Sequence, residues 1–272
     1  MSAKITAATA LNPLKRTMQD NGILRLTLDN PPANTLSDAM LAALQLAFDD
    51  AAIDKNVRVI ILAANGHLFC AGHDVKEMTA RRSDDDRGRA YFADLMGRCA
   101  NVMQTIVNHP KPIIAEVNGL ATAAGCQLVA SCDLAIASDE ATFCTPGVHI
   151  GLFCSTPMVA LSRTIHRKHA MEMLLTGEAV DASSAREYGL VNRVVPKDYL
   201  QQVTNKYAES IAAKSSHTLK VGKQAFYQQM EMGLAQAYDF TANVMVENML
   251  AKDAEEGIGA FLQDRKPEWV DE

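Results

Sequence analysis

The sequence has few aromatic residues and little excess charge of either sign. Aromatic side chains make up 6% of the 272 residues, and the formal net charge is −6. Nucleic-acid binding draws on clustered lysine and arginine that neutralise phosphates, so this acidic chain, which has no basic stripe, is not expected to bind nucleic acid. No run approaches the roughly 18 apolar residues that span a bilayer, so we expect no membrane segment.

The cysteines lack the spacing of a zinc site. Cys70, Cys99, Cys126, Cys132, Cys144 and Cys154 lie far apart or in apolar runs, whereas zinc knuckles place two cysteines two residues apart. We therefore expect reduced thiols in a cytosol-like compartment, no metal site and no bound cofactor. The N-terminal residues lack the apolar core of a secretory signal, and a cleaved organelle presequence remains an alternative.

Apolar periodicity predicts alternating strands and helices up to about residue 157. Strands are expected at 23–28, 57–63, 112–117 and 134–137, and helices after the N-cap Ser37, over 92–106 and over 125–131. This order indicates right-handed βαβ units on a mainly parallel sheet. Only helices are expected after residue 157. The chain is therefore divided into an N-terminal extension (1–20), a core domain (21–196) and a C-terminal helical section (197–272).

Two glycine-containing segments follow predicted strands, FCAGHD at 69–74 and ATAAGCQ at 121–127. Either one alone indicates only close backbone packing. Together with NPPANTL at 30–36, LLTGEAVDASSAREYGLVNRVVP at 174–196 and EEGIGAFLQDRKPEW at 255–269, they resemble the crotonase, or enoyl-CoA hydratase/isomerase, family in the family's order. The resemblance implies an α/β fold with a ClpP-like ββα superhelix, an acyl-CoA thioester as ligand, and C-terminal helices that form a homotrimer or a dimer of trimers.

In that family two backbone N–H groups bind the thioester oxygen, and carried onto this sequence they belong to His73 and Ala124. Donors fixed in place stabilise a developing enolate without reorganising, and the dipole of the helix predicted from 125 favours the same negative charge. The family often has glycine where this chain has Ala123 and Ala124, and alanine is compatible where φ is negative.

The resemblance also implies a set of further contacts to CoA or substrate. The matching lysine, Lys76, lies near the ribose-phosphate end of CoA, where a flexible ammonium suits a phosphate. The matching C-terminal residues reach the CoA of a neighbouring subunit. The whole set is Ala33, Ala71, Gly72, Asp74, Val75, Lys76, Ala123, Gly125, Phe261 and Lys266.

The sequence departs from the family at the two positions of its catalytic glutamates, which hold Gln127 and Gly147. Hydration of an enoyl thioester needs a proton removed from water and another delivered to the α-carbon, a task suited to two carboxyl groups. An amide does not titrate near neutral pH, and glycine has no side chain. The segments 122–133 and 145–157 are similar to the enoyl-CoA hydratase domain-containing proteins of mitochondria and bacteria, and the two-glutamate mechanism is not expected.

Other side chains with chemical potential are His149, Cys154, Ser155, Asp74 and the imidazole of His73. A thiol or hydroxyl nucleophile needs a base within hydrogen-bond reach, which sequence alone does not establish. Two hypotheses stay open. The first is an enzyme that works through an enolate, as an isomerase, hydrolase, decarboxylase or hydratase with relocated acid and base groups; the second is a noncatalytic acyl-CoA-binding or regulatory protein. We expect the cytoplasm for a bacterial protein and the mitochondrial matrix for a eukaryotic one.

Overall fold

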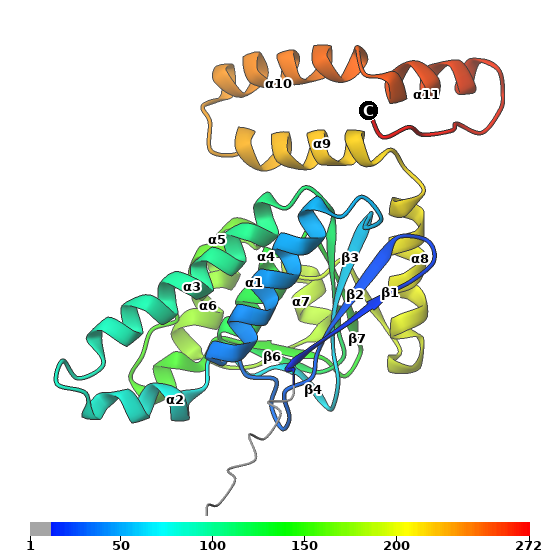
Figure 1. The fold of residues 1–272 in the computed structure, drawn as a ribbon. Coiled ribbons are helices and arrows are strands. Elements are labelled where there is room, and N and C mark those ends of the chain that lie inside the picture. Colours follow the sequence, from blue (N-terminus) through cyan, green and yellow to red (C-terminus); the bar gives the residue numbers. More distant parts are fainter. Residues whose placement is uncertain (1–11) are drawn as a thin grey trace, which may run out of the picture.

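The computed structural model describes residues 12–272, so residues 1–11 of the predicted extension, and any presequence there, lie outside the described part. Ten strands of this part form two sheets (Figure 1). Neighbouring strands are parallel except β1 with β2 and β8 with β9. In spatial order the larger sheet consists of β1 (Leu14–Met18), β2 (Ile23–Leu28), β3 (Val59–Ala64), β5 (Ile113–Val117), β7 (Leu134–Ser138) and β10 (Arg193–Val195), and the smaller sheet of β4 (Leu68–Cys70), β6 (Leu120–Thr122), β8 (Thr142–Cys144) and β9 (Val180–Asp181).

A strand–strand–helix unit repeats along the chain. In each unit the first strand (β3, β5 or β7) joins the larger sheet and the second (β4, β6 or β8) joins the smaller one. This is the ββα repeat that the family resemblance implies. Helices follow the second strand: α2 (Val75–Ala80) and α3 (Arg89–Asn108) after β4, α4 (Ala124–Ser131) after β6, and α5 (Pro157–Thr164) and α6 (Arg167–Thr176) after β8.

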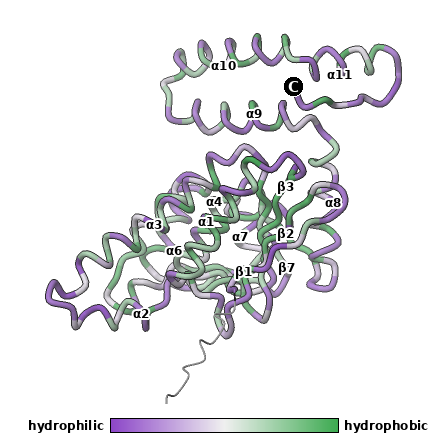
Figure 2. The backbone as a smooth tube through the Cα atoms, viewed as in Figure 1, coloured by the Kyte–Doolittle hydropathy of each residue, from purple (hydrophilic) through white to green (hydrophobic). Residues whose placement is uncertain are grey.

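Helices cover both faces of the larger sheet, which explains why its central strands are apolar throughout. In β3, Ile60 and Leu62 pack into the cluster formed with α1 and α3, whereas Val59 and Ile61 pack with α8. Successive side chains of a strand point to opposite faces, so a continuous apolar run is buried between two layers. Figure 2 shows this hydrophobic interior. The other elements of this part are α1 (Asp38–Ile53), α7 (Ala182–Tyr188), α8 (Leu200–Ala212), η1 (Arg81–Ser83), η2 (Pro146–Ile150) and η3 (Lys197–Tyr199).

Three helices at the C-terminal end form a layer of their own beside the core (Figure 1). They are α9 (Ser216–Gln229), α10 (Leu234–Met249) and α11 (Lys252–Leu262). Neither α9 nor α10 has a buried residue. On the core side, the Lys223 Nζ donates to Asp133 Oδ2 at 2.7 Å and the Tyr227 hydroxyl donates to Asp133 Oδ1 at 3.1 Å. Polar contacts, rather than a shared apolar core, therefore hold α9 to the sheet.

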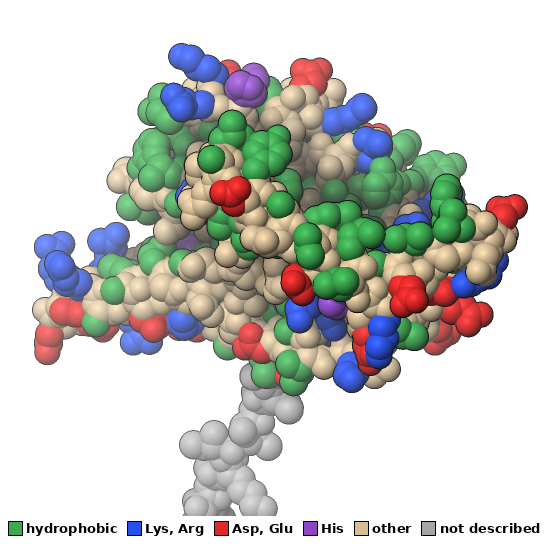
Figure 3. Space-filling view, turned by 90° about the horizontal axis from the view of Figure 1, so that it is seen from above, with side chains coloured by type: hydrophobic (Ala, Val, Ile, Leu, Met, Phe, Trp, Pro, Cys, Tyr) green, Lys and Arg blue, Asp and Glu red, His purple; other side chains and the backbone are tan. Residues whose placement is uncertain are grey.

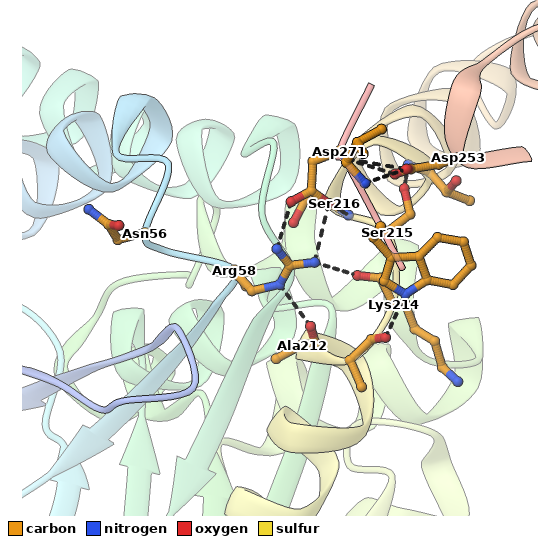
Figure 4. A network of polar contacts seen from close by, with 12 residues as sticks. Asn56, Arg58, Ala212, Lys214, Ser215, Ser216, Asp253 and Asp271 are labelled. Atoms are coloured by element: carbon orange, nitrogen blue, oxygen red, sulfur yellow. Dashed lines mark hydrogen bonds and ion pairs between the residues drawn. The ribbon is translucent and has the colours of Figure 1, made fainter. Parts of the chain in front are cut away.

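The last residues of the chain return to the core through a second polar network (Figure 4). The Arg58 guanidinium donates to Asp271 Oδ2 at 2.7 Å and to the Lys214 carbonyl at 2.7 Å. Asp271 Oδ1 also accepts from Ser216 N, and the Asp271 N–H donates to Asp253 Oδ2 at 3.0 Å. The Asp271 carboxylate thus joins the start of β3 to the α8–α9 connection, and the Asp271 main-chain N–H joins both to the start of α11.

Most of the elements predicted from periodicity are present. The expected strands correspond to β2, β3, β5 and β7, and Ser37 caps α1 by accepting from the Met40 N–H at 3.2 Å. The structure adds β1, which lies in the predicted extension and pairs with β2, and it adds β9 and β10, which lie in the region expected to be only helical. It also separates α8, which packs on the sheet, from the outer layer of α9 to α11.

Candidate functional site

The predicted site segments follow three adjacent parallel strands. The small sheet has the order β4-β6-β8, and both pairs are parallel. The segments 71–76, 123–127 and 145–147 each begin where one of these strands ends. Because the carboxyl ends of parallel strands lie at one edge of a sheet, the three segments share that edge, which is where ligands commonly bind in open α/β sheets.

The first two segments are in direct contact. Gly72 has φ +82°, and a Cβ added there would lie 3.0 Å from the Ala123 Cβ and 3.2 Å from the Ala124 nitrogen. A Cβ at Gly125 would lie 2.2 Å from the Cys70 carbonyl oxygen. Glycine is therefore required at both places, since any side chain would push the two segments apart.

The N–H groups of His73 and Ala124 are both uncommitted. Among the described residues, neither N–H donates a backbone hydrogen bond, although the adjacent Ala123 N–H donates to the Cys144 carbonyl at 2.9 Å. Ala124 is the first residue of α4, and the first N–H groups of a helix have no partner within it. Both N–H groups therefore stay available to a ligand, and the positive end of the α4 dipole favours negative charge beside Ala124.

Strained and unpaired groups gather at these segments. Ala123 has φ 52° and ψ −118°, so the sequence-based condition of a negative φ holds for Ala124 but is wrong for Ala123. His73 Nε2 and Gln127 Oε1 are buried without a hydrogen-bond partner in the described part of the chain. Strained backbone and orphaned polar atoms cost folding free energy and concentrate at functional sites, so these features mark the same place as the motifs.

The NPPANTL segment pairs with the first of these loops. The Ala71 N–H donates to the Ala33 carbonyl at 3.0 Å, and the Leu36 N–H donates to the Gly72 carbonyl at 2.8 Å. Asp74 is the N-cap of α2, where its carboxylate accepts from the Lys76 N–H at 2.8 Å. A carboxylate in this capping role stabilises the start of the helix. This structural role is enough to account for an aspartate at position 74, with no part in a reaction.

Val75 and Lys76 lie on the exposed side of α2. Val75 is 57% exposed, and Lys76 is also exposed. The Lys76 ammonium makes no salt bridge to any residue in the range 12–272. A solvated ammonium next to the loop remains free to meet a phosphate.

Gln127 and Gly147, which occupy the positions of the family's two glutamates, are both buried. Gln127 is 4% exposed in the first turns of α4. Gly147 lies in η2, where an added Cβ would come within 2.8 Å of the Leu152 carbonyl oxygen and 3.0 Å of Cys154 Sγ. A glutamate at position 147 would therefore need the 152–154 segment to move.

His149 and Cys154 do not form a nucleophile–base pair. The His149 Nε2 donates to the Thr176 carbonyl at 2.8 Å, and no hydrogen bond joins it to Cys154 within the described residues. Cys154 is 8% exposed, and burial raises the pKa of its thiol, with the Gly147 N–H opposing that effect. Ser155 Oγ donates to the Phe153 carbonyl at 3.3 Å. His149 and Ser155 thus form hydrogen bonds to nearby carbonyl groups, and Cys154 has no hydrogen-bonded base among the described residues.

Phe261 and Lys266 lie away from the other predicted site residues. Figure 1 shows α11 at the opposite end of the molecule from α2. Phe261 is 84% exposed at the end of α11, and Lys266 is exposed in the segment after it. Within one chain the structure therefore does not bring these two residues to the loops.

Sequence reasoning missed a polar group whose charges act on His73. Asp38 accepts from the Arg98 guanidinium at 2.7 Å and from the Tyr91 hydroxyl at 3.2 Å, and the charges of Arg98 and Asp38 act on the pKa of His73. No motif marks these residues, because polar side chains on amphipathic helices are usually solvated. In residues 12–272 no three His, Cys, Asp or Glu side chains are grouped to hold a metal ion, and no helix there could span a membrane.

Sequence comparison defines the class to which this fold and site belong. A profile of the enoyl-CoA hydratase/isomerase family matches residues 18–272. The chain belongs to this family, the crotonases, as its motifs indicate.

Within this family, the chain is similar to the following proteins. Enoyl-CoA hydratase domain-containing protein 3, mitochondrial, is 49% identical in Xenopus laevis over 259 residues, covering 95% of this chain and 86% of the relative. The solved structure of the human protein of that name has a TM-score of 0.90 and 49% identity and covers 94% of this chain and 100% of its own. An enoyl-CoA hydratase structure from Mycobacterium smegmatis has a TM-score of 0.91 and 48% identity, covering 94% and 98%.

Proposed function

We propose that this protein binds an acyl-CoA thioester and polarises its carbonyl through the N–H groups of His73 and Ala124. The contact between the two loops supports the proposal, because it brings two uncommitted donors together. Donors about 2.7 to 3.1 Å from a developing oxyanion stabilise charge without reorganising, and one donor can change the rate by about 10² to 10³.

The chemistry proposed is enolate formation rather than hydration by two glutamates. Gln127 and Gly147 offer no group that titrates near neutral pH, so they cannot remove a proton from water or deliver one to carbon. The reaction is therefore an isomerisation, hydrolysis, decarboxylation or hydration in which other groups, or the substrate itself, move the protons.

A panel of acyl-CoA thioesters that differ in chain length and oxidation state tests this proposal. We expect turnover of at least one member by the wild type, and a loss of about 10² or more in rate for Ala124→Pro, which removes one donor. Proline is tolerated at the first position of a helix, and Ala124 has that position in α4. Arg167→Pro, at the first position of α6, is the control for a proline at a helix start. Because Ala123 has a ψ of −118°, which a following proline disfavours, circular dichroism of Ala124→Pro checks that the variant is folded.

The second candidate function is acyl-CoA binding without turnover. Gln127 and Gly147 favour it, because both lack acid–base capacity while the main-chain donors remain uncommitted. Calorimetry that detects binding of a thioester, together with inactivity across the whole panel, would select this candidate. Turnover that Ala124→Pro abolishes in a folded protein would reject it.

We further propose a homotrimer, or a dimer of trimers, formed through the C-terminal layer. Figure 3 looks onto this layer and shows hydrophobic side chains gathered among charged ones. Monomeric soluble proteins rarely leave a large contiguous apolar area in water. We therefore expect other copies of this chain to cover the apolar side chains of the C-terminal layer. Light scattering that gives a monomer at micromolar concentration would refute the trimer. The exposed residues include Phe226, Met230, Leu234, Tyr238, Met245, Val246, Met249, Leu250, Phe261 and Leu262.

In such an assembly Phe261 and Lys266 would serve the site of a neighbouring subunit, which accounts for their distance from the loops of their own chain. Two vertebrate relatives at 49% identity carry the word mitochondrial in their names, and a bacterial relative from Rhizobium meliloti is 34% identical over 246 residues. We propose the mitochondrial matrix for a eukaryotic source and the cytoplasm for a bacterial one.

A further inference from the structure

An ion pair lies buried where α9 meets the core of the molecule. The Lys223 side chain is 7% exposed, and its Nζ donates to Asp133 Oδ2 at 2.7 Å. It also donates to the Ile106 carbonyl at 2.9 Å and to the Lys111 carbonyl at 3.1 Å. An ammonium has three donors, so every donor of Lys223 is used. The outer helix α9 is thereby fixed to the end of α3 and to the residues before β5.

The carboxylate of Asp133 is the centre of this cluster. Its Oδ2 also accepts from the Ile113 N–H at 2.7 Å, and its Oδ1 accepts from the Tyr227 hydroxyl at 3.1 Å. Burial raises the pKa of Asp133, with Lys223 opposing that effect, and burial lowers the pKa of Lys223, with Asp133 opposing it. Each charge therefore depends on its partner, because a buried charge left alone is costly.

Helix α4 connects this cluster to the loops of the proposed site. Ala124 is its first residue, and Asp133 follows its last residue, Ser131, by two positions. All residues of α4 are buried, so the helix is a rod about 12 Å long that is enclosed by its neighbours. Main-chain N–H groups lie nearly parallel to a helix axis. The direction of the Ala124 N–H therefore follows the tilt of α4.

Hydrogen bonds at both ends of α4 determine that tilt. Just before the helix, the Ala123 N–H donates to the Cys144 carbonyl at 2.9 Å. A single bond of this kind lets a rod pivot, and the apolar packing along the helix is non-directional. Beyond the other end, Asp133 is bonded to both main-chain groups of Ile113 and to α9. This second attachment prevents the pivot.

We propose that Lys223 is a positioning residue, which holds the Ala124 N–H in its direction by fixing Asp133 at the far end of α4. Docking of α9 on the core and binding of a ligand at the loops are then coupled, since both depend on the tilt of one helix. By linkage, each of the two events favours the other. This inference rests on the proposed function.

Loss of the Lys223 ammonium should make ligand binding depend on pH. In Lys223→Met, Asp133 keeps its buried position without a cation, so its pKa rises further. Above that pKa the unpaired carboxylate is charged and the end of α4 is displaced, whereas below it the neutral acid needs no cation and the helix returns. The affinity lost at about pH 8 should therefore be regained as the pH falls to about 5.5.

The other titratable side chains around the pair do not produce this response. Burial raises the pKa values of Cys132 at the end of α4 and of Tyr227 on α9, so both stay neutral. Burial lowers the pKa of His109 to about 4, so this ring is neutral as well. The Lys111 ammonium donates to the Asp54 carbonyl at 2.8 Å, outside the cluster. The pH response of the variant is therefore assigned to the buried carboxyl group.

Calorimetry with acetyl-, butyryl-, octanoyl- and palmitoyl-CoA tests the inference, using the thioester that binds the wild type most tightly. The ratio of the dissociation constants of variant and wild type cancels the titration of the ligand itself. For Lys223→Met we expect a ratio of at least about fivefold at about pH 8 and of less than about twofold at about pH 5.5. Lys223→Met/Asp133→Asn has no unpaired charge and keeps an oxygen for the Ile113 N–H, so it should bind within about threefold of the wild type at both pH values.

Two controls separate positioning from a general loss of stability. Lys220→Met removes an exposed ammonium from the same helix and should bind like the wild type. Arg25→Met breaks the buried Arg25–Glu116 pair, which lies against α8 on the other face of the larger sheet from α4. This variant should be less stable but should keep its affinity.

A milder variant carries the test if Lys223→Met does not fold by circular dichroism. Tyr227→Phe removes only the hydroxyl that donates to Asp133 and should weaken binding about threefold at about pH 8. Tyr199→Phe, on an exposed tyrosine in η3, should not weaken it.

The outcomes distinguish this inference from the function on which it rests. A ratio for Lys223→Met equal to that for Lys220→Met or Arg25→Met, or a loss of the same size at both pH values, would overturn the role of Lys223. Equal affinities of Tyr227→Phe and Tyr199→Phe would overturn it as well. If none of the four thioesters binds the wild type, the proposed function itself fails.

Discussion

Ala123 occupies a backbone conformation that glycine adopts more readily. Its φ of 52° and ψ of −118° follow from tertiary contacts, because its N–H is held by the Cys144 carbonyl while its Cβ faces Gly72. The strain is located between the two proposed donors and helps to fix their spacing. Such residues cost of order 1–3 kcal/mol and persist where the surroundings over-determine them.

Replacing this alanine should therefore stabilise the protein. Ala123→Gly relieves the strain but gives the unfolded chain more freedom, which costs about 0.4–1 kcal/mol. We expect the free energy of unfolding in urea to rise by about 1 kcal/mol. Ala42→Gly, on the exposed side of α1, should lower it by about 1 kcal/mol. A decrease for Ala123→Gly as large as that of the control would show that the conformation is unstrained.

The buried His109 should make stability depend on pH. Its Nε2 donates to the Phe48 carbonyl at 3.0 Å, its Nδ1 accepts from the Lys111 N–H at 3.1 Å, and its side chain is 2% exposed. Burial lowers the pKa of His109 from 6.5 to about 4. Between these values the unfolded chain binds a proton that the folded chain does not, so the stability present above pH 6.5 declines as pH falls toward 4.

The expected loss attributable to His109 is at most about 3 kcal/mol between pH 6.5 and pH 4. Urea unfolding at half-unit pH steps measures it. His109→Gln should flatten this part of the profile, whereas His166→Gln, on an exposed histidine, should leave its slope unchanged. Burial also lowers the pKa of His73, which adds a smaller decline of the same sign. A profile for His109→Gln parallel to that of the wild type would contradict the assignment.

At the scale of elements, the site depends on how closely α4 approaches the end of β4. An alanine at position 125 would place its Cβ 2.2 Å from the Cys70 carbonyl oxygen, which is backbone and cannot step aside alone. Gly125→Ala should therefore lower the free energy of unfolding by about 1–3 kcal/mol and, if the proposed function holds, weaken acyl-CoA binding.

Gly97→Ala is the matched control for this prediction. It also adds a methyl to a helical glycine, but nothing lies within 4 Å of the new atom. Since alanine is the better helix former, we expect a gain of up to about 1 kcal/mol in unfolding free energy. Equal effects of the two substitutions would mean that the tight contact at Gly125 does not decide the position of α4.

Elements with strong periodicity could be predicted from the sequence, whereas the short strands could not. The alternation in 23–28 and the Ser37 cap identify β2 and α1 because the signals are local. β4, β6 and β8 have three residues each, too few for a period, and their pairing is set by the stacking of the units. The motifs indicated His73 and Ala124 as neighbours, but the φ of Ala123 and the Asp38–Arg98 surroundings of His73 depend on contacts between distant segments.

At the scale of the whole molecule, the carboxylate of Asp271 joins the outer helices to the core (Figure 4). The main-chain oxygen of Glu272 accepts from the Asp253 N–H at 3.0 Å, and the side-chain carboxylate of Glu272 pairs with Lys252. The Trp269 indole donates to the Ala213 carbonyl at 2.9 Å. With no buried residue in α9 or α10, these polar contacts carry much of the attachment.

Removing this carboxylate should loosen the outer layer without unfolding the core. For Asp271→Asn we expect amide exchange across α9 to α11 to become about tenfold faster, because hydrogen bonds to charged groups contribute about 1.5–3 kcal/mol. Exchange in β3 and β5 should not change. Asp239→Asn, on the exposed side of α10, serves as the control. Uniform acceleration in both the layer and the sheets would show that the two parts open together.

Because the ββα unit is repeated, the residues of the site come from three separate segments, which follow β4, β6 and β8. Each stretch ends at the same edge of the small sheet, and the direction of its main-chain N–H groups is dictated by strand spacing and helix starts. Side chains on one stretch can therefore be exchanged during evolution while the proposed oxygen-binding geometry survives. A scaffold of this kind can lose one reaction, and acquire another, by a few replacements at the ends of its strands.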